Sequence, residues 1–474
     1  MTRRKSRGNF SGTARPKQAV AFFPVWLINV RVEGKKQFHI VVLGAGFGGL
    51  TFCKTFRHPN ARITLVDRTN HHLFQPLLYQ VATCALSATD VAQPIRGILS
   101  NRPDITVLLD KATGFDLAQK KVFLEKSALD YDYLVLALGG HTGYFGHHEW
   151  EQFAPGLKTL DDALRLRSRI LLAFEKAEME TNPVEHDRLM TIIVVGGGPT
   201  GVELAGSFAE LTRTVMNLDF RRIDPSQAHV ILLEGGPRIL SHLPPDLSEK
   251  AKWQLIHLGV NVKTDTQVKS IREGIVELAN GKIIKAGNIV WAAGVASTPL
   301  TKKLGCELDR GGRVKVNPDL SVPNHPEIFA IGDMALVLKA DGKPVPGVSP
   351  AAMQMGKHVA KIIKTELSLT RSSTTLSPSD GERDGVRGKP DRPPFKYWDK
   401  GTMATVGRSA AVAQMGRLKL AGYPAWLAWL FVHLLFLVGF RNRTAVMFQW
   451  AYSYFSNRRS ARIITHQTQE VEED

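Results

Sequence analysis

FHIVVLGAGFGGL at residues 38–50 and MTIIVVGGGPTGVEL at residues 190–204 are the two stretches that decide the fold. Each reads as a continuous apolar strand, a glycine-rich turn and the start of a helix. In the spacing GxGxxG, the first glycine permits a tight turn, the second lets the backbone approach a pyrophosphate, and the third allows the helix to pack closely on the strand. The two units therefore predict an α/β fold with two Rossmann-like dinucleotide-binding domains.

The first glycine motif consists of Gly44, Gly46 and Gly49. Asp67 lies 18 residues after Gly49, at the end of a second apolar strand over residues 62–66. A carboxylate at that position accepts hydrogen bonds from a ribose. The combination indicates a nucleotide site more strongly than a glycine-rich turn alone, which would need no acid at the strand end.

The second glycine motif consists of Gly196, Gly198 and Gly201. Glu234 ends the strand of residues 229–233, and the spacing is long because residues 211–227 are inserted before that strand. An acid here accepts from a ribose 2′-hydroxyl and repels a 2′-phosphate, so the motif favours NADH over NADPH. The nearby Arg238 could weaken that preference.

Other segments follow the same α/β pattern. The strand in IFAIGDMA at residues 328–335 closes on Asp333, where a carboxylate could bind a polyol. The strands at residues 131–140 and 288–294 end in glycine and read as crossings between the two domains. Residues 161–180 form a charged amphipathic pattern that predicts a helix leading into the second domain.

Composition excludes several classes of protein. With 474 residues, 43% of them hydrophobic and 22% charged, the chain is globular rather than disordered. Its cysteines, Cys53, Cys84 and Cys306, have no paired spacing, so neither a disulfide framework nor a zinc ribbon is available, and a reducing compartment fits best. His71 and His72 form no metal-binding spacing with another His or Cys, so we expect no metal site.

Positive charge concentrates at the two ends of the chain, whose net charge is +17. Residues 1–32 carry seven Lys and Arg, residues 401–469 carry eight, and neither segment contains an acid. This distribution favours a polyanionic partner such as anionic lipid headgroups. Nucleic acid is disfavoured because no base-stacking fold or recognition helix accompanies the charge. The basic residues 1–37 read either as an extension or weak surface anchor, or as a cleaved targeting peptide.

YPAWLAWLFVHLLFLVGF at residues 423–440 is the most apolar segment. A helix over residues 425–440 would be about 24 Å long, short against a hydrocarbon core of about 30 Å. Flanking aromatic and Arg residues favour a segment on the membrane surface, with a transmembrane helix or a buried core helix as the alternatives. Residues 367–394 are rich in Ser, Thr, Gly and Pro and predict a flexible surface insertion.

Within the flavoproteins that have two dinucleotide-binding domains, the chain resembles the type II NADH dehydrogenases, the non-pumping NADH:quinone oxidoreductases. The resemblance covers about residues 38–465 apart from the insertion and is carried by NHHLFQPLLYQVAT (70–83), GVELA (201–205), SPAAMQMG (349–356), KGTMATVGR (400–408) and GFRNR (439–443). It implies an FAD-binding domain at residues 38–160 and 301–366, an NADH-binding domain inserted at residues 161–300, and a membrane-association region at residues 395–474.

The resemblance also implies a role for individual residues. Those that would hold FAD are Gly44, Gly46, Gly49, Asp67 and Asp333, with Gln75, Pro76 and Leu77 near the isoalloxazine. Those that would hold NADH are Gly196, Gly198, Gly201 and Glu234. Glu203 would lie at the contact between nicotinamide and flavin, although an acid in a first helical turn is also stabilised by the helix dipole alone. Gln354 would line the quinone end, where Pro350 replaces a second glutamine found in many members.

The expected activity is transfer of a hydride from NADH to FAD, followed by transfer of two electrons to a membrane quinone without proton pumping. The cysteines argue against a disulfide reductase or a sulfide:quinone oxidoreductase, both of which need a redox pair. The alternative is a soluble NADH-dependent flavoprotein that reduces another acceptor. We expect the protein on the cytoplasmic face of the inner (plasma) membrane, and the sequence leaves a homodimer open.

Overall fold

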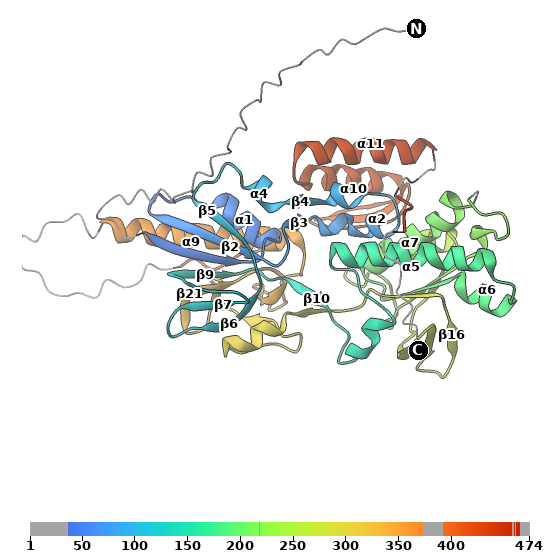
Figure 1. The fold of residues 1–474 in the computed structure, drawn as a ribbon, viewed down its shortest axis with the longest axis horizontal. Coiled ribbons are helices and arrows are strands. Elements are labelled where there is room, and N and C mark those ends of the chain that lie inside the picture. Colours follow the sequence, from blue (N-terminus) through green and yellow to red (C-terminus); the bar gives the residue numbers. More distant parts are fainter. Residues whose placement is uncertain (1–36, 218, 373–391, 457–458, 460, 465–474) are drawn as a thin grey trace, which may run out of the picture. The chain divides into compact units, whose positions relative to one another are not determined.

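The computed structural model describes residues 37–217, 219–372, 392–456, 459 and 461–464. The basic extension expected at residues 1–37 lies outside the described residues apart from Gln37. Most of the insertion expected at residues 367–394 lies outside them as well. The core of the described chain is two mainly parallel β-sheets with helices packed against them (Figure 1).

The first sheet has six strands in the order β20-β21-β9-β1-β2-β5. Its strands are β1 (Phe38–Leu43), β2 (Ala61–Asp67), β5 (Ile105–Leu109), β9 (Tyr133–Leu136), β20 (Ser321–Val322) and β21 (His325–Ala330). All neighbours are parallel except β20 and β21. Ile40, Val41 and Val42 of β1 are fully buried, as expected for a central parallel strand that is covered on both faces.

The second sheet has four parallel strands in the order β13-β12-β11-β17. Its strands are β11 (Thr191–Val195), β12 (His229–Leu233), β13 (Val260–Lys263) and β17 (Asn288–Trp291), and its helices include α5 (Leu160–Met179), α7 (Pro199–Glu210) and α8 (Pro245–His257). All these strands lie between β9 and β21 in the sequence. The predicted α/β fold with one Rossmann-like unit inserted in the other is therefore confirmed.

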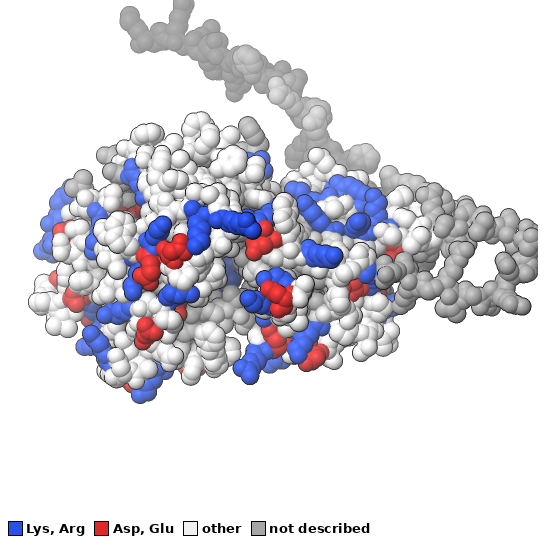
Figure 2. Space-filling model, turned by 180° about the vertical axis from the view of Figure 1, so that it is seen from behind, with Lys and Arg blue, Asp and Glu red and all other residues white. Residues whose placement is uncertain are grey.

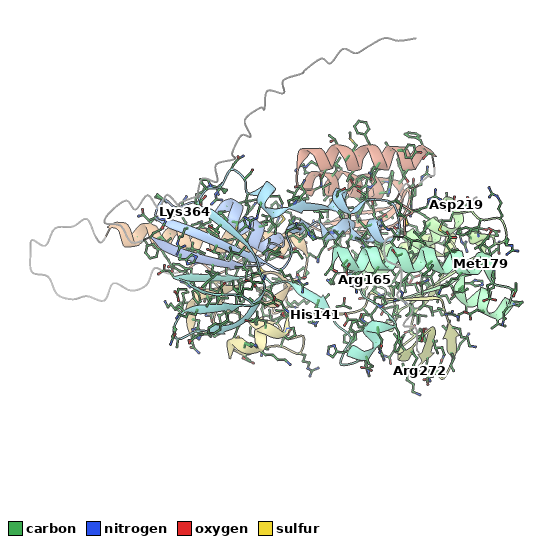
Figure 3. The ribbon with its side chains drawn as sticks, in the orientation of Figure 1. His141, Arg165, Met179, Asp219, Arg272 and Lys364 are labelled. Carbon is green, nitrogen blue, oxygen red and sulfur yellow. The ribbon has the colours of Figure 1, made fainter. Side chains whose placement is uncertain are left out.

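The two passages of the chain between the sheets lie side by side. β10 (Gly140–Thr142) follows the first sheet, β18 (Val295–Ser297) follows the second, and the two pair antiparallel. His141 lies in the middle of β10 (Figure 3). On the outward passage, Thr159 begins α5 with a capping box, in which its side chain accepts from the Asp162 N–H and the Asp162 carboxylate accepts from the Thr159 N–H.

Helices α1 (Phe47–Thr55) and α9 (Ser349–Ser372) pack tightly against one another beside the first sheet (Figure 1). The contact is close because Gly356 of α9 faces the backbone of Gly48 in α1. α9 continues to Ser372, so the segment expected to begin as an insertion at residue 367 starts inside a helix. Leu367 is only 2% exposed, and this burial keeps the helix going through a polar-rich sequence.

The C-terminal region differs from its prediction. A three-stranded antiparallel sheet of β23 (Thr402–Gly407), β24 (Ala410–Met415) and β25 (Leu418–Ala421) leads into α10 (Tyr423–Phe436) and α11 (Phe440–Ser456). The single helix expected over residues 425–440 is wrong. α10 ends at Phe436 because the buried Leu437 is extended and Gly439 takes a φ of +86°, a conformation that favours glycine.

No helix in the described ranges has the length and apolar character needed to cross a bilayer. α10 instead has one buried and one exposed side. Ala425 and Trp429 are buried, whereas Phe431 and Leu435 are more than half exposed. The buried side agrees with the core-helix interpretation, and the exposed apolar side leaves the membrane-surface interpretation as a prediction.

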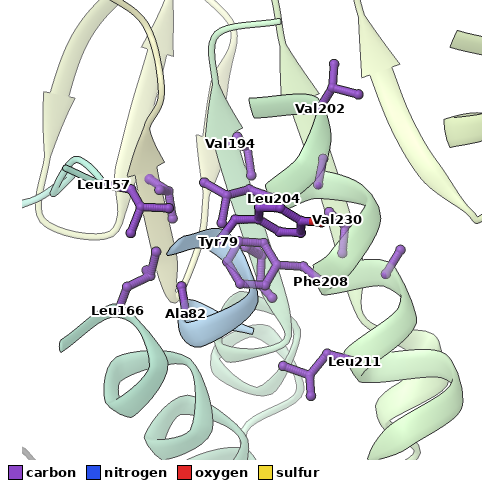
Figure 4. Close-up of a cluster of buried hydrophobic side chains, with 14 of the residues drawn as sticks. Tyr79, Ala82, Leu157, Leu166, Val194, Val202, Leu204, Phe208, Leu211 and Val230 are labelled. Atoms are coloured by element: carbon purple, nitrogen blue, oxygen red, sulfur yellow. The ribbon is translucent and has the colours of Figure 1, made fainter. Parts of the chain in front are cut away.

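The largest hydrophobic core joins the second sheet to α2 (Leu78–Ala82), α5, α7 and the C-terminal region. Figure 4 shows Tyr79 of α2 lying against Leu204 and Phe208 of α7, with Leu166 of α5 nearby. Trp429 of α10 belongs to the same core. The C-terminal helices are thus part of the folded body.

Replacing Gly356 with Ala tests the contact between α1 and α9. The new methyl group would overlap the carbonyl oxygen of Gly48, so we expect a loss of about 1–3 kcal/mol in the free energy of unfolding. Thermal and denaturant unfolding measure it. The control is Gly97→Ala in α4 (Ile95–Ile98), where the nearest atom is 3.9 Å away. That change should leave stability equal or slightly higher, and equal losses in both variants would contradict the packing argument.

Candidate active site

The first glycine loop is fixed by the carboxylate that ends the neighbouring strand. Gly44 has a φ of +100°, and a side chain there would overlap the backbone of Ala137. Oδ2 of Asp67 accepts from the backbone N–H of Ala45 at 2.6 Å, and Oδ1 accepts from the N–H and hydroxyl of Thr69 at 2.7 and 2.8 Å. The acid therefore holds the loop in shape and leaves its remaining lone pairs for a ligand.

The second loop repeats this arrangement with a longer acid. Gly196 has a φ of +110°, Oε2 of Glu234 accepts from the N–H of Gly197 at 2.6 Å, and Oε1 accepts from the N–H of Gly236 at 2.7 Å. In both loops the third glycine packs on the backbone of the first, Gly49 on Gly44 and Gly201 on Gly196. The two predicted nucleotide sites have the same local construction.

The middle glycines test whether dinucleotides fit. A Cβ built on Gly46 or on Gly198 meets no heavy atom within 4 Å. These two loop positions therefore face open space at the starts of α1 and α7. Backbone N–H groups at the start of a helix bind phosphate, so both cradles suit a pyrophosphate.

Asp333 lies in a pocket beside the first turns of α9. It is part of a short turn, Gly332–Met334, in which the Gly332 N–H donates to Sδ of Met355 at 3.2 Å. Residues that line this pocket include Gly332, Asp333, Gly347, Ala351, Ala352 and Met355. The structure therefore brings Asp333 together with the helix that carries Gln354.

Glu203 lies in α7 beneath β23, past the first turn, which contains no acid, so its expected place in the first helical turn is wrong. Burial raises the pKa of Glu203 to about 8, and a hydrogen bond from the backbone of Thr405 in β23 opposes that rise. Gly206 of α7 touches the carbonyl of Val406, so the strand lies directly on the helix. The carboxyl is therefore poised to gain or lose a proton near neutral pH, which a solvent-exposed acid would not do.

The segment expected near the isoalloxazine divides into exposed and buried residues. Gln75 is exposed and its Nε2 donates to the carbonyl of Lys158 at 3.2 Å, Pro76 is half-buried, and Leu77 is completely buried in the core. His72, considered above only as a metal ligand, donates from Nδ1 to the carbonyl of Ala45 in the first glycine loop at 2.8 Å. Its Nε2 has no hydrogen-bond partner among the described residues.

Gln354 has its side-chain amide oriented by a neighbouring segment. Its Nε2 donates to the carbonyl of Trp398 at 2.9 Å, and its Oε1 accepts from the Trp398 N–H at 2.9 Å. Nζ of Lys400 lies 5.1 Å from the ring centroid of Trp398 and 5.6 Å from that of Phe436. The sequence did not identify Trp398 as part of the site, because the two residues are 44 positions apart and no local pattern links them.

Comparison with known proteins decides the family. The family model described as pyridine nucleotide-disulphide oxidoreductase matches residues 38–356, and the model described as NDH2 C-terminal domain matches residues 399–459. The type II NADH:quinone oxidoreductase NdhA of Mycobacterium tuberculosis is 42% identical over 90% of this chain and 89% of its own length. The chain belongs to the type II NADH:quinone oxidoreductase family.

Further relatives agree with this assignment. The Ndh enzyme of the same organism, also named a type II NADH:quinone oxidoreductase, is 41% identical over 91% of each chain. Among solved structures, NDH2 from Plasmodium falciparum superposes with a TM-score of 0.78 at 21% identity, covering 90% of this chain and 99% of that one. The resemblance drawn from the sequence motifs is confirmed.

The cysteines separate this type II chain from disulfide chemistry on the same fold. A sulfide:quinone oxidoreductase from Aquifex aeolicus shares the fold, with a TM-score of 0.62 at 18% identity over 88% of this chain and 95% of that one. Here all three cysteines are free, and burial raises the pKa of Cys53 to about 12 and that of Cys84 to about 11. These thiols stay protonated and are poor nucleophiles. Among the described residues there is also no cluster that could hold a metal ion.

Asp67→Asn tests the first loop. One oxygen becomes an NH₂ group that must face a backbone or hydroxyl donor, at a cost of about 1–3 kcal/mol. We expect FAD binding to weaken by roughly tenfold or more, measured as the flavin-to-protein absorbance ratio after purification and dilution. The control is Asp116→Asn, whose Oδ1 accepts from the Gln119 N–H of a neighbouring exposed turn. Full flavin retention in Asp67→Asn would contradict the assignment.

Proposed function

We propose that this chain oxidises NADH and reduces a membrane quinone without pumping protons. The observation that carries the proposal is the pair of glycine loops, each fixed by a strand-end acid, in a chain 42% identical to a named type II NADH:quinone oxidoreductase. When bound, FAD accepts a hydride equivalent and passes two electrons on. The protein's own residues bind the two dinucleotides, orient the quinone and hold a proton near the nicotinamide.

The two glycine loops and the acids beside them bind the dinucleotides in this proposal. Gly44, Gly46, Gly49, Asp67 and Asp333 hold FAD, and Gly196, Gly198, Gly201 and Glu234 hold NADH. The Glu234 carboxylate accepts a hydrogen bond from a ribose 2′-hydroxyl and repels a 2′-phosphate, so NADH is the substrate in preference to NADPH. Glu203 lies beside the nicotinamide and holds a proton near neutral pH because burial raises its pKa.

Gln354 acts at the quinone end in this proposal. Each side-chain amide nitrogen carries two N–H groups. One N–H of Gln354 is used by the Trp398 carbonyl, which leaves the other for a quinone carbonyl oxygen. The bond from the Trp398 N–H to Oε1 stops the amide from turning over, so the free donor keeps its direction. Pro350 donates no hydrogen bond at the position of the second glutamine.

The exposed faces of α10 and α11 form the membrane surface in this proposal. The large apolar side chains with more than a third of their area exposed are Tyr423, Leu427, Phe431, Leu435, Phe436, Met447, Phe448, Tyr452 and Phe455. Figure 2 shows the surface above these helices as mostly uncharged, whereas charges of both signs are interspersed elsewhere on that face. Such a patch is large for a soluble monomer and suits a lipid surface.

This surface explains how a lipid-soluble quinone reaches the site. Lys400 and Phe436 place the end of α10 beside Trp398, and therefore close to Gln354. We place the protein on the cytoplasmic face of the inner membrane, where NADH is available. A homodimer stays a prediction, which sedimentation of the detergent-solubilised chain would test.

Anaerobic titration tests the proposed activity. NADH should bleach the flavin absorbance of the purified chain, and a short-chain quinone should restore it. NADPH should bleach it more slowly by roughly tenfold or more, as a repelled phosphate predicts. A colourless protein, or a flavin that NADH does not reduce, would contradict the proposal. Reoxidation by soluble dyes but not by quinones would favour the soluble reductase instead.

Phe448→Glu combined with Phe455→Glu tests the membrane surface. Burying one phenylalanine contributes about 1.5–3 kcal/mol, so each change should weaken vesicle binding by roughly tenfold or more. Co-sedimentation with anionic vesicles measures it, and turnover with a water-soluble quinone should stay close to that of the unmodified chain. Trp253→Glu on α8, at a position 60% exposed, is the matched control and should bind vesicles normally. If all variants, including the control, lost vesicle binding equally, the assignment of this face as the membrane surface would be contradicted.

A further inference from the structure

The segment that follows β10 makes a tight turn with an exposed phenylalanine at its centre. Phe145 and Gly146 have φ values of +53° and +99°, and the N–H of His147 donates to the carbonyl of Tyr144 at 3.0 Å. Two consecutive positive φ values with this hydrogen bond are typical of a type I′ turn, where Asn, Asp and Gly are preferred. Burial does not offset the cost of placing a bulky residue there, because Phe145 is 74% exposed. Strain of this kind points to a function for the side chain.

The residues that precede Phe145 are fixed by a buried aromatic cluster. Nε1 of Trp291, at the end of β17, donates to the carbonyl of Gly143 at 3.0 Å. Tyr144 stacks on Trp291 with the ring centroids 5.6 Å apart, and its hydroxyl donates to the carbonyl of Ala154 at 3.0 Å. Tyr144 and Trp291 are 2% and 4% exposed. The turn therefore presents the ring of Phe145 on a rigid support.

The ring of Phe145 lies over the end of β17. Its centroid is 6.2 Å from that of Trp291, in an edge-to-face arrangement at 66°. A Cβ built on Gly294 would lie 2.9 Å from Cζ of Phe145, so the ring covers this glycine. The peptide of residues 292–293, just before it, packs on Gly196 of the second glycine loop. The ring and the second loop therefore border the same strand end.

The order of the strands decides which half of a dinucleotide passes this strand end. The order β13-β12-β11-β17 places β12 and β17 on opposite sides of β11. In the proposed function, Glu234 at the end of β12 binds the adenosine ribose, and the loop after β11 binds the pyrophosphate. A dinucleotide lies across the carboxyl ends of the strands, so its nicotinamide half extends over the end of β17.

The crossing strands join this strand end to the site proposed for FAD. Gly140, at the start of β10, lies beside Asp333, because a Cβ built on Gly140 would be 3.6 Å from that of Asp333. At the other end of β10, Thr142 pairs with Val295, which follows Gly294 (Figure 1). Hydride transfer requires the nicotinamide close to the flavin. The turn at Phe145 thus lies at the end of the segment that connects the two sites.

We propose that Phe145 is a binding residue for the nicotinamide half of NADH, with its exposed ring packed against that half at the end of β17. The inference rests on the proposed function, which places NADH on the second glycine loop. It adds the residue that recognises the redox-active half of the molecule. An aromatic ring suits a flat nicotinamide. Because the turn holds the ring in place beforehand, little conformational freedom is lost on binding.

Titration calorimetry of the oxidised holoenzyme with NAD⁺ and with ADP-ribose tests the inference in Phe145→Asn. Asn tolerates a positive φ, so this change removes the ring and leaves the turn intact. We expect NAD⁺ to bind roughly tenfold more weakly. ADP-ribose, which has no nicotinamide, should bind as it does to the unmodified chain. Phe145→Tyr keeps the ring and should bind both ligands normally.

Steady-state kinetics and thermal unfolding give two further readouts. The KM for NADH should rise in Phe145→Asn by about the same factor as the Kd for NAD⁺. The unfolding temperature should not fall, because Asn suits the turn better than Phe. A purely structural role for Phe145 would instead lower the unfolding temperature and weaken the binding of both ligands.

Phe123→Asn is the matched control. Phe123 is 42% exposed on β7 (Lys121–Leu124), in a separate three-stranded sheet, and its loss should change neither affinity. An equal loss of affinity for both ligands in Phe145→Asn, or an unchanged affinity for NAD⁺, would overturn the inference. If the unmodified chain bound neither ligand, the NADH site of the proposed function would itself be contradicted, so the two failures are distinguishable.

Discussion

Both glycine loops depend on one interaction, the hydrogen bond from a loop N–H to the carboxylate that ends the next strand. The carboxylate of Asp67 accepts a hydrogen bond from the N–H of Ala45, and that of Glu234 accepts one from the N–H of Gly197, each with an N···O distance of 2.6 Å. The first and third glycines of each turn pack closely on backbone, the middle glycine faces open space, and the acid holds the N–H beside it. Because β1 and β2 are parallel neighbours, as are β11 and β12, the acid at the end of the adjacent strand lies next to the loop in both units, even though residues 211–227 are inserted before β12. The carboxylate thus shapes the loop, in addition to the ribose contact proposed for it.

The C-terminal region packs against the helix that carries Glu203, in addition to the membrane contact proposed for it. β23 lies on α7 and supplies the backbone group that contacts Glu203. The buried Arg459, beyond α11, is paired with Glu210 on α7 and donates to the carbonyl of Thr83 at 2.8 Å. Losing one member of such a buried pair leaves a charge without compensation. The C-terminal region and α7 are therefore expected to fold as one unit.

The parts of the fold and site that the sequence could predict are those fixed by the spacing of residues close together in the chain. The strands, glycine turns and strand-end acids lie within short distances of one another in the chain, so their geometry follows from the pattern alone. The environment of Glu203 does not follow from the local pattern, because Thr405, which contacts it, is about 200 residues away in the chain. The break between α10 and α11 was missed because hydropathy runs unbroken through Gly439, whose positive φ only tertiary packing reveals. The orientation of Gln354 likewise depends on Trp398, a contact that no periodicity encodes.

Two short helices meet a physical demand that one spanning helix would not. A quinone is soluble in lipid, whereas NADH and its binding loop require water, so the electron path must end at the interface. A pair of helices lying at that interface can present Phe431 and Phe448 outward while Trp429 and Trp450 pack inward. In the proposed function the exposed side of this helix pair would contact lipid, while its buried side packs in the core that contains Tyr79. A spanning helix would surround its side chains with hydrocarbon. The helix break at Gly439 instead lets one pair of helices expose apolar side chains on one side, while on the other side the indole N–H of Trp450 donates to Oε1 of Gln80 at 2.8 Å.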